Sequence, residues 1–122
     1  MVTFDRASGN IGIDSACIGV GYSGAPGHVG VCADEALHAL GPIPAGRWII
    51  GDPYDHPVLG PCCMNLTPAP GTETFGRGDF RIHADNASKP PKSSSEGCLV
   101  ASHDTRARIA AYLATSRELV VT

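Results

Sequence analysis

Glycine and proline interrupt this chain so often that long regular elements have little room. The 122 residues include 15 glycines and 10 prolines, about one residue in five. Both residues concentrate in tight turns, because glycine tolerates positive φ and proline presets φ for a turn. The pattern therefore predicts a β-rich domain of short strands and tight loops. The length suits one domain with one core, which we assign to residues 1–122.

Composition and charge exclude two classes of protein. The net charge is −3, and lysine and arginine are scattered rather than gathered in a stripe, which argues against nucleic-acid binding. No apolar run approaches the ~18–20 residues that a membrane-spanning helix needs, so we expect no membrane insertion. The first ten residues lack the basic and apolar regions of a secretory signal. We therefore expect synthesis in the cytoplasm without a cleaved signal.

Short apolar and β-branched runs mark the expected strands. These runs cover residues 2–6, 11–13, 17–22, 47–51, 62–68, 79–85, 98–102 and 118–121. The run 79–85, "DFRIHAD", alternates most clearly. Its alternation places Phe80 and Ile82 toward the core and Arg81 and His83 on the opposite face. The proline-bounded segment 52–61 between two strands is expected to be a surface loop or the rim of a cleft.

Two segments carry helix signals. Residues 34–42, "DEALHALGP", begin with a capping aspartate and end at Gly41–Pro42. Residues 103–116 follow Ser102, which can cap them, as can Asp104, and present an apolar stripe of Ile109, Tyr112 and Leu113. We therefore expect two short helices beside the strands.

Five cysteines make an odd number, so at least one is unpaired within the chain. They are Cys17, Cys32, Cys62, Cys63 and Cys98. No C-x2-C spacing occurs, and adjacent cysteines make a poor zinc chelate. For the first four, buried thiols and disulfides formed after export both remain open, because a sequence does not give connectivity.

Cys98 stands apart because a histidine with suitable placement precedes it. A cysteine nucleophile needs a base that forms the thiolate and donors that hold the oxyanion. Cys98 follows Gly97 at a loop-to-strand junction, where the two backbone N–H groups can converge as an oxyanion hole. Loop 86–97 is long enough to bring Cys98 beside His83. His103 is a competing base, but a helix start disfavours its imidazolium form.

Two polar residues follow the candidate base directly. Asp85 and Asn86 can orient either His83 or a substrate. The same region permits a different chemistry, in which His83, Asp85 and Cys98 bind a metal ion.

The motifs around these residues resemble a known family. "IHADN" followed by "SSEGCLV" resembles the H…(S/T)-x-G-C signature of L,D-transpeptidases, which act on bacterial peptidoglycan. A wider ordered set over about residues 20–110 resembles the small L,D-transpeptidase-like toxin domain of type VI secretion effectors and of phage or prophage proteins. This set comprises "GYSG", "GPIPAGRWIIGDPYDHPVLGP", "NLTP", "GRGDFRIHADN" and "SEGCLVASHDTRARI".

Three positions depart from the family patterns. Glu96 and Val100 stand where the larger L,D-transpeptidases usually have histidine and arginine. Ala84 stands where the toxin family usually has glycine. The first departure fits the toxin subfamily, but it limits what can be inferred about the substrate.

The resemblance implies an L,D-transpeptidase-like β-sandwich or barrel and a role for each matching residue. Cys98 would be the acyl-accepting nucleophile and His83 its base, with Ser95 and Gly97 shaping the nucleophile turn. No metal or organic cofactor is implied.

Three further residues in the matched segments have two readings each. Arg77, in "GRGDF", is either a solvated loop residue or the partner of a stem-peptide carboxylate. Tyr22 and Ser23, in "GYSG", either line the cleft or serve packing and turns.

The implied activity is modification of peptidoglycan tetrapeptide stems, as an L,D-carboxypeptidase, an L,D-transpeptidase or a D-amino-acid exchange enzyme. The implied setting is an antibacterial effector delivered to a rival's periplasm or a phage protein released at lysis, and we expect an immunity protein as a partner of an effector. Two alternatives stay open: a metal-dependent peptidoglycan hydrolase, and a non-catalytic phage structural or wall-binding module.

Overall fold

The computed structural model describes all 122 residues and is mainly β, as predicted. The strands are β1 (Val2–Phe4), β2 (Asn10–Ile13), β3 (Ala16–Val20), β4 (Tyr22–Ser23), β5 (Gly46–Ile50), β6 (Tyr54–His56), β7 (Gly60–Pro68), β8 (Arg81–His83), β9 (Leu99–Val100) and β10 (Glu118–Val121). Each run expected to be a strand overlaps one of these strands, and β6 adds a short one inside the segment expected to be a loop.

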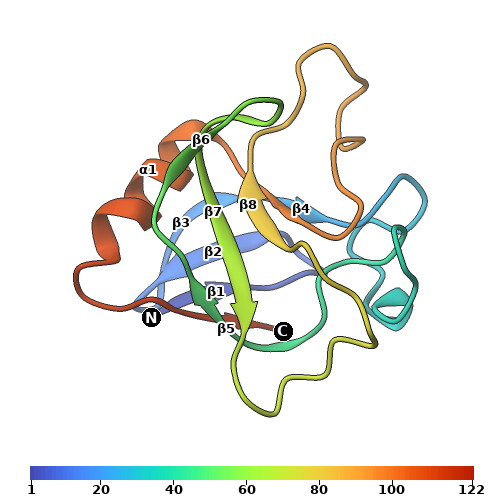
Figure 1. The fold of residues 1–122 in the computed structure, drawn as a ribbon, viewed down its shortest axis with the longest axis horizontal. Coiled ribbons are helices and arrows are strands. Elements are labelled where there is room, and N and C mark those ends of the chain that lie inside the picture. The colour runs from blue at the N-terminus through green and yellow to red at the C-terminus, as the bar shows by residue number, and fades with distance from the viewer.

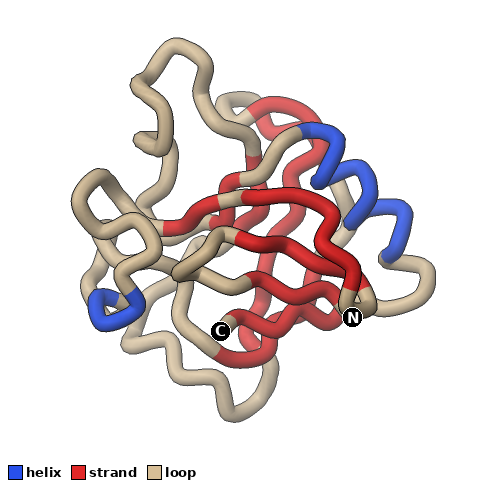
Figure 2. The backbone as a smooth tube through the Cα atoms, turned by 180° about the vertical axis from the view of Figure 1, so that it is seen from behind, coloured by secondary structure: helices blue, strands red, loops and turns tan.

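The ten strands form one mixed sheet rather than two packed sheets. Its order is β3-β2-β1-β10-β5-β7-β8-β9-β4, with β6 paired to β7. The strands curl around a common interior (Figures 1 and 2). The expected sandwich or barrel is therefore corrected to a single curved sheet that does not close by hydrogen bonding.

The two outermost strands of this order, β3 and β4, are consecutive in the chain and separated by Gly21 alone. A Cβ at Gly21 would lie 2.4 Å from the carbonyl oxygen of Val100. Only glycine fits there. Through Gly21 the chain passes directly from one edge strand, β3, to the other edge strand, β4.

One of the two expected helices is present. Helix α1 (His103–Tyr112) begins after Ser102, whose Oγ accepts the N–H of Thr105 at 3.2 Å. Ser102 is therefore the cap, and the helix ends four residues earlier than the run predicted.

The expected helix over 34–42 is wrong. A short 3-10 turn, η1 (Cys32–Asp34), and a series of turns occupy this region. Leu37 and Leu40, which would have formed the apolar face, are 41% and 43% exposed. A helix this short needs tertiary packing for its stability, and these side chains find none. Ala39 adopts φ of 60°, which breaks any helical path.

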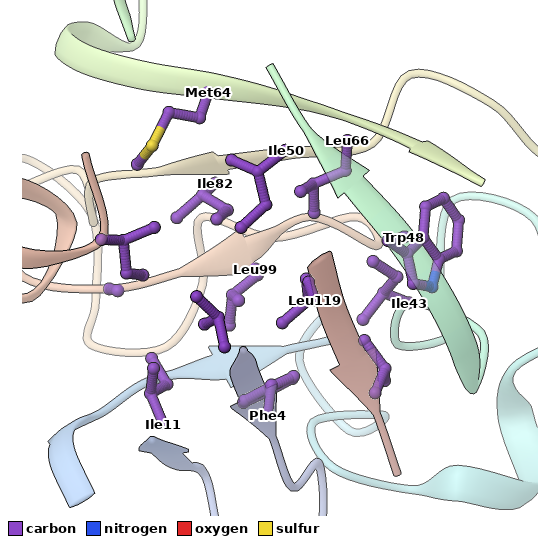
Figure 3. Close-up of a cluster of buried hydrophobic side chains, with 14 of the residues drawn as sticks. Phe4, Ile11, Ile43, Trp48, Ile50, Met64, Leu66, Ile82, Leu99 and Leu119 are labelled. Carbon is purple, nitrogen blue, oxygen red and sulfur yellow. The ribbon is translucent and has the colours of Figure 1, made fainter. Parts of the chain in front are cut away.

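The curved sheet encloses one core of 16 buried residues, and Figure 3 shows side chains from strands on opposite sides of the sheet meeting inside it. Trp48 is the largest of them, and its Nε1–H donates to the carbonyl of Pro44 at 3.1 Å. Its ring meets Phe80 edge-on, with centroids 4.9 Å apart. Phe80 in turn lies under the guanidinium of Arg77, so the core supports the residues beside the candidate site.

Replacing Trp48 with alanine should therefore lower the free energy of unfolding by about 3–5 kcal/mol, because it empties the centre of the core. Val58→Ala is the control, since Val58 is 84% exposed and surface changes of this kind usually stay within about 0.5 kcal/mol. Urea denaturation of both variants measures the difference. A loss at Trp48 no larger than that at Val58 would contradict this account of the core.

Candidate active site

Strands β8 and β9 bring Cys98 and His83 to the same cleft. The two strands pair in parallel, with Ile82 beside Leu99 and His83 beside Val100. Continuing this register back by one residue places Cys98 beside Arg81. Because alternate side chains share a face, Cys98, Arg81 and His83 project to the same side. All three line a cleft of about 530 Å³.

The geometry around His83 suits a neutral base. The ring is only 3% exposed, and Nδ1 lies 2.7 Å from the carbonyl oxygen of Ala84. A carbonyl only accepts, so Nδ1 carries the proton and Nε2 keeps its lone pair. Burial lowers the pKa of His83, and the charges of Arg81 and Arg106 act in the same direction. The imidazole lies on the face that the alternation predicted, although it is buried rather than exposed.

Cys98 is held as a thiol on the neighbouring strand, two positions before the residue that pairs with His83. Its Sγ donates to the carbonyl of Asp79 at 3.5 Å. Burial raises the pKa of the thiol, and the carboxylates of Asp79 and Glu96 add to the increase. The backbone N–H and the charge of Arg81 oppose it. The raised pKa of the Cys98 thiol and the lowered pKa of the His83 imidazole favour the neutral form of both groups.

The turn before Cys98 depends on Ser95 and Gly97. Gly97 has φ of 133°, a region that L side chains rarely adopt. The Oγ of Ser95 accepts the N–H of Gly97 at 3.1 Å and that of Gly24 at 3.0 Å, and donates to the carbonyl of Cys98 at 2.7 Å. One buried hydroxyl therefore fixes both sides of the turn.

The expected oxyanion hole needs a correction. The N–H of Gly97 already donates to Ser95, so it does not point at a substrate. The N–H of Cys98 makes no hydrogen bond within the protein and remains as a donor. The sequence indicated a glycine turn but not that a serine hydroxyl takes up one of its two donors.

Arg77 is neither a solvated residue nor a free carboxylate ligand. It is 9% exposed, and its two terminal nitrogens donate to four backbone carbonyls. These belong to Glu35 at 2.5 Å, Pro42 at 2.8 Å, Gly41 at 2.8 Å and Glu96 at 3.4 Å. The guanidinium thus joins the segment 35–42 to the nucleophile turn, and no bidentate edge remains for a substrate.

Ser23 supports the same turn from behind. It is fully buried, donates to the carbonyl of Gly97 at 3.1 Å and accepts the N–H of Ile43 at 2.8 Å. It therefore holds the turn and does not line the cleft.

Tyr22, Asp85 and Asn86 organise loop 86–97 and form no hydrogen bond with His83. The hydroxyl of Tyr22 donates to Asp85 at 2.6 Å and accepts the N–H of Ser94 at 2.9 Å. Burial, with the Asp85 hydrogen bond, raises the pKa of Tyr22 to about 12, so this link persists at physiological pH. The N–H of Asn86 donates to Ser94 Oγ at 2.8 Å, which pins the loop at both ends.

The structure forms no group of three or more His, Cys, Asp or Glu side chains able to hold a metal ion. The ligand set His83, Asp85 and Cys98 is not assembled, because Asp85 faces Tyr22. All five cysteines are free thiols. No helix has the length and apolar character needed to cross a membrane.

Sequence reasoning overlooked Arg81, which lies beside Cys98. The signal was present, because the alternation of 79–85 places Arg81 on the same face as His83. Arg81 lies in the same motif as Arg77, but its position beside Cys98 follows from the pairing of β8 with β9. No protein-family model matches this chain, and no curated protein matches it.

The geometry of Gly97 predicts that Gly97→Ala lowers the free energy of unfolding by more than the strain of a positive φ alone. The new Cβ would lie 2.4 Å from a terminal nitrogen of the buried Arg77. Gly27→Ala is a matched control, since Gly27 also has positive φ, +85°, but nothing lies within 4 Å of its added Cβ. We expect a loss of roughly 1–3 kcal/mol from strain at both positions and a further loss at Gly97, measured by urea denaturation. Equal losses would contradict the clash.

The neutral Cys98–His83 pair predicts how thiol reactivity changes with pH. Only the thiolate alkylates quickly, and the pKa of Cys98 lies above the ordinary value of 9.0. The rate of Cys98 alkylation by iodoacetamide should therefore rise from pH 6 through pH 9 without a plateau. Mass spectrometry of the Cys98 peptide measures this, with exposed Cys17 reporting reagent quality. A plateau across pH 5–8 would instead show a preformed thiolate–imidazolium pair.

Proposed function

We propose that this protein is a cysteine enzyme of the L,D-transpeptidase type that acts on the tetrapeptide stems of peptidoglycan. The observation that carries the proposal is the placement of Cys98 and His83 on one face of two paired strands, lining one cleft. The bond from His83 to Ala84 leaves Nε2 as the basic nitrogen. The ordered motifs of the sequence supply the substrate class.

In this mechanism, Cys98 attacks the carbonyl carbon of the bond between the third stem residue and the terminal D-alanine. Its proton passes to Nε2 of His83 as the C–S bond forms. The free N–H of Cys98 lies beside the developing oxyanion. When the C–N bond breaks, His83 returns the proton to the departing amine, and D-alanine leaves.

The resulting thioester is resolved by a second nucleophile. Water gives an L,D-carboxypeptidase, a free D-amino acid gives exchange, and the amine of another stem gives a crosslink. In each case His83 takes a proton from the attacking group. When the C–S bond breaks, His83 passes this proton to the sulfur, and Cys98 is again a thiol. The products of the reaction identify the acceptor.

The proposed biological setting is an attack on the bacterial wall. Delivery by a secretion system, or release of a phage protein at lysis, would bring the protein to the periplasm. For a secreted effector we propose an immunity protein that fills the cleft and protects the producing cell.

The test is mass spectrometry of tetrapeptide muropeptides incubated with wild type and with Cys98→Ala. Wild type should release or exchange the terminal D-alanine, and the variant should not, because no other group there forms a thioester. Cys17→Ala is the matched control, since Cys17 is an exposed thiol outside the cleft. Identical products from wild type and Cys98→Ala would overturn the proposal. Loss of activity to a chelator would favour a metal-dependent hydrolase.

The same assay separates the two candidate bases. His83→Ala should lower kcat/KM by about 10²–10⁴, the usual contribution of general acid–base catalysis. His103→Ala should change it less than threefold, because His103 begins helix α1 and does not line the cleft. The reverse pattern would assign the base to His103.

A further inference from the structure

We propose that Arg81 binds the terminal carboxylate of the stem peptide and so restricts the enzyme to substrates with one residue after the scissile bond. The inference rests on the proposed function and names the feature of the substrate that the cleft recognises. Binding of the stem-peptide carboxylate was one of the two roles that the sequence suggested for Arg77, and we now propose it for Arg81.

Arg81 is positioned by the strand pairing itself. The register of β8 and β9 places it beside Cys98, and its backbone N–H and its charge both act to lower the pKa of the Cys98 thiol. Its side chain is half-buried and lines the cleft. The guanidinium therefore enters the cleft from the residue adjacent to the nucleophile.

The guanidinium of Arg81 is held in place by one hydrogen bond, and its two terminal nitrogens remain free to bind a ligand. Its Nε donates to the hydroxyl of Tyr54 at 3.1 Å, and that hydroxyl donates to Asn65 Oδ1 at 2.6 Å. Tyr54 comes from β6 and Asn65 from β7, so two further strands hold Arg81 in place. The terminal nitrogens of Arg81 make no protein hydrogen bond or ion pair, although those of Arg77 are fully used.

Among the charged side chains that line the cleft, Arg81 is the one held in place that could bind the carboxylate of a substrate. Asp79 and Glu96 line the cleft and repel an anion. Lys89 is the remaining side-chain cation among the lining residues not bound to protein carbonyls, and it is exposed on loop 86–97. A preorganised fork suits a carboxylate better than a flexible ammonium does, because it forms two parallel hydrogen bonds.

We expect the carboxylate of a single residue after the scissile bond to lie in the cleft near Arg81. Paired strands lie about 4.8 Å apart, which sets the separation of the Cys98 and Arg81 backbones. A carboxylate one residue past the attacked carbonyl lies one residue length, roughly 3.5 Å, from it. A second residue would move the carboxylate away by roughly 3.5 Å and leave a neutral amide at Arg81.

The decisive experiment compares two tetrapeptides that differ only in a terminal carboxylate or carboxamide. Wild type should prefer the acid by about 10–100-fold in kcat/KM, the range for a charged hydrogen bond. Arg81→Gln should bring the acid-to-amide ratio close to one, and Arg81→Lys should give an intermediate ratio. Lys89→Gln removes the other cleft cation and should keep the wild-type ratio. General damage to the site cancels in this ratio.

A second measurement needs no peptide substrate. Iodoacetate and iodoacetamide alkylate the same sulfur and differ in the charge that Arg81 would attract. The rate ratio of the anion to the amide at Cys98 should exceed that at Cys17 in the same sample. Arg81→Gln should lower it several-fold while Arg108→Gln, an exposed arginine on helix α1 outside the cleft, leaves it unchanged.

The outcomes separate this inference from the proposed function. Cys98-dependent cleavage with the same acid-to-amide ratio in wild type and Arg81→Gln overturns the role of Arg81 and leaves the enzyme assignment standing. A ratio abolished by Lys89→Gln also overturns it, because it moves recognition to the loop. Absence of any cleavage by wild type overturns both.

Discussion

The site depends on one buried positive charge whose hydrogen bonds hold the nucleophile turn. The guanidinium of Arg77 donates to carbonyls of the segment 35–42 and of Glu96. A buried cation is costly unless its donors are satisfied, so these chain segments must come together for the protein to fold. The missing side chain at Gly97 makes room for this arrangement. Phe80 and Trp48 beneath it then connect the turn to the core.

Support and chemistry are divided between different residues. Ser23, Ser95 and Arg77 are buried and use their polar atoms on the backbone, so they determine where Cys98 lies. His83 and Arg81 share the face of Cys98 and keep nitrogen atoms available. In this division, the two serines and the arginine of the quoted motifs fix the geometry of the turn that precedes Cys98.

Local patterns predicted the elements that depend on local rules. The alternation of 79–85 identified β8 and the face of His83, and Ser102 marked the start of α1. The helix expected over 34–42 failed because its leucines find no partner, a fact that belongs to the tertiary structure. The two roles expected for Arg77, a solvated loop residue or a carboxylate partner, failed for a related reason. Which guanidinium is free depends on carbonyls far away in the sequence, and no local pattern records them.

The oxyanion donors illustrate the same limit. A glycine before a cysteine indicates a turn with two N–H groups, but the hydroxyl that takes one of them, Ser95, was assigned only a general role in shaping that turn. Its contact with Gly24 joins the turn to the segment after β4, which no spacing within 93–100 reveals.

The position of β10 has a consequence for the order of folding. This strand lies between β1 and β5. Its Leu119 pairs with Val2 of β1, so the two paired residues are separated by nearly the whole sequence. The pairings of β10 with β5 and of β9 with β4 also join distant segments. Contacts of such long range form slowly, because the entropy of closing a large loop must be offset first. The cleft that holds Cys98 should therefore form late, after the chain has been synthesised beyond residue 118, so a ribosome-bound intermediate carries Cys98 without the assembled cleft.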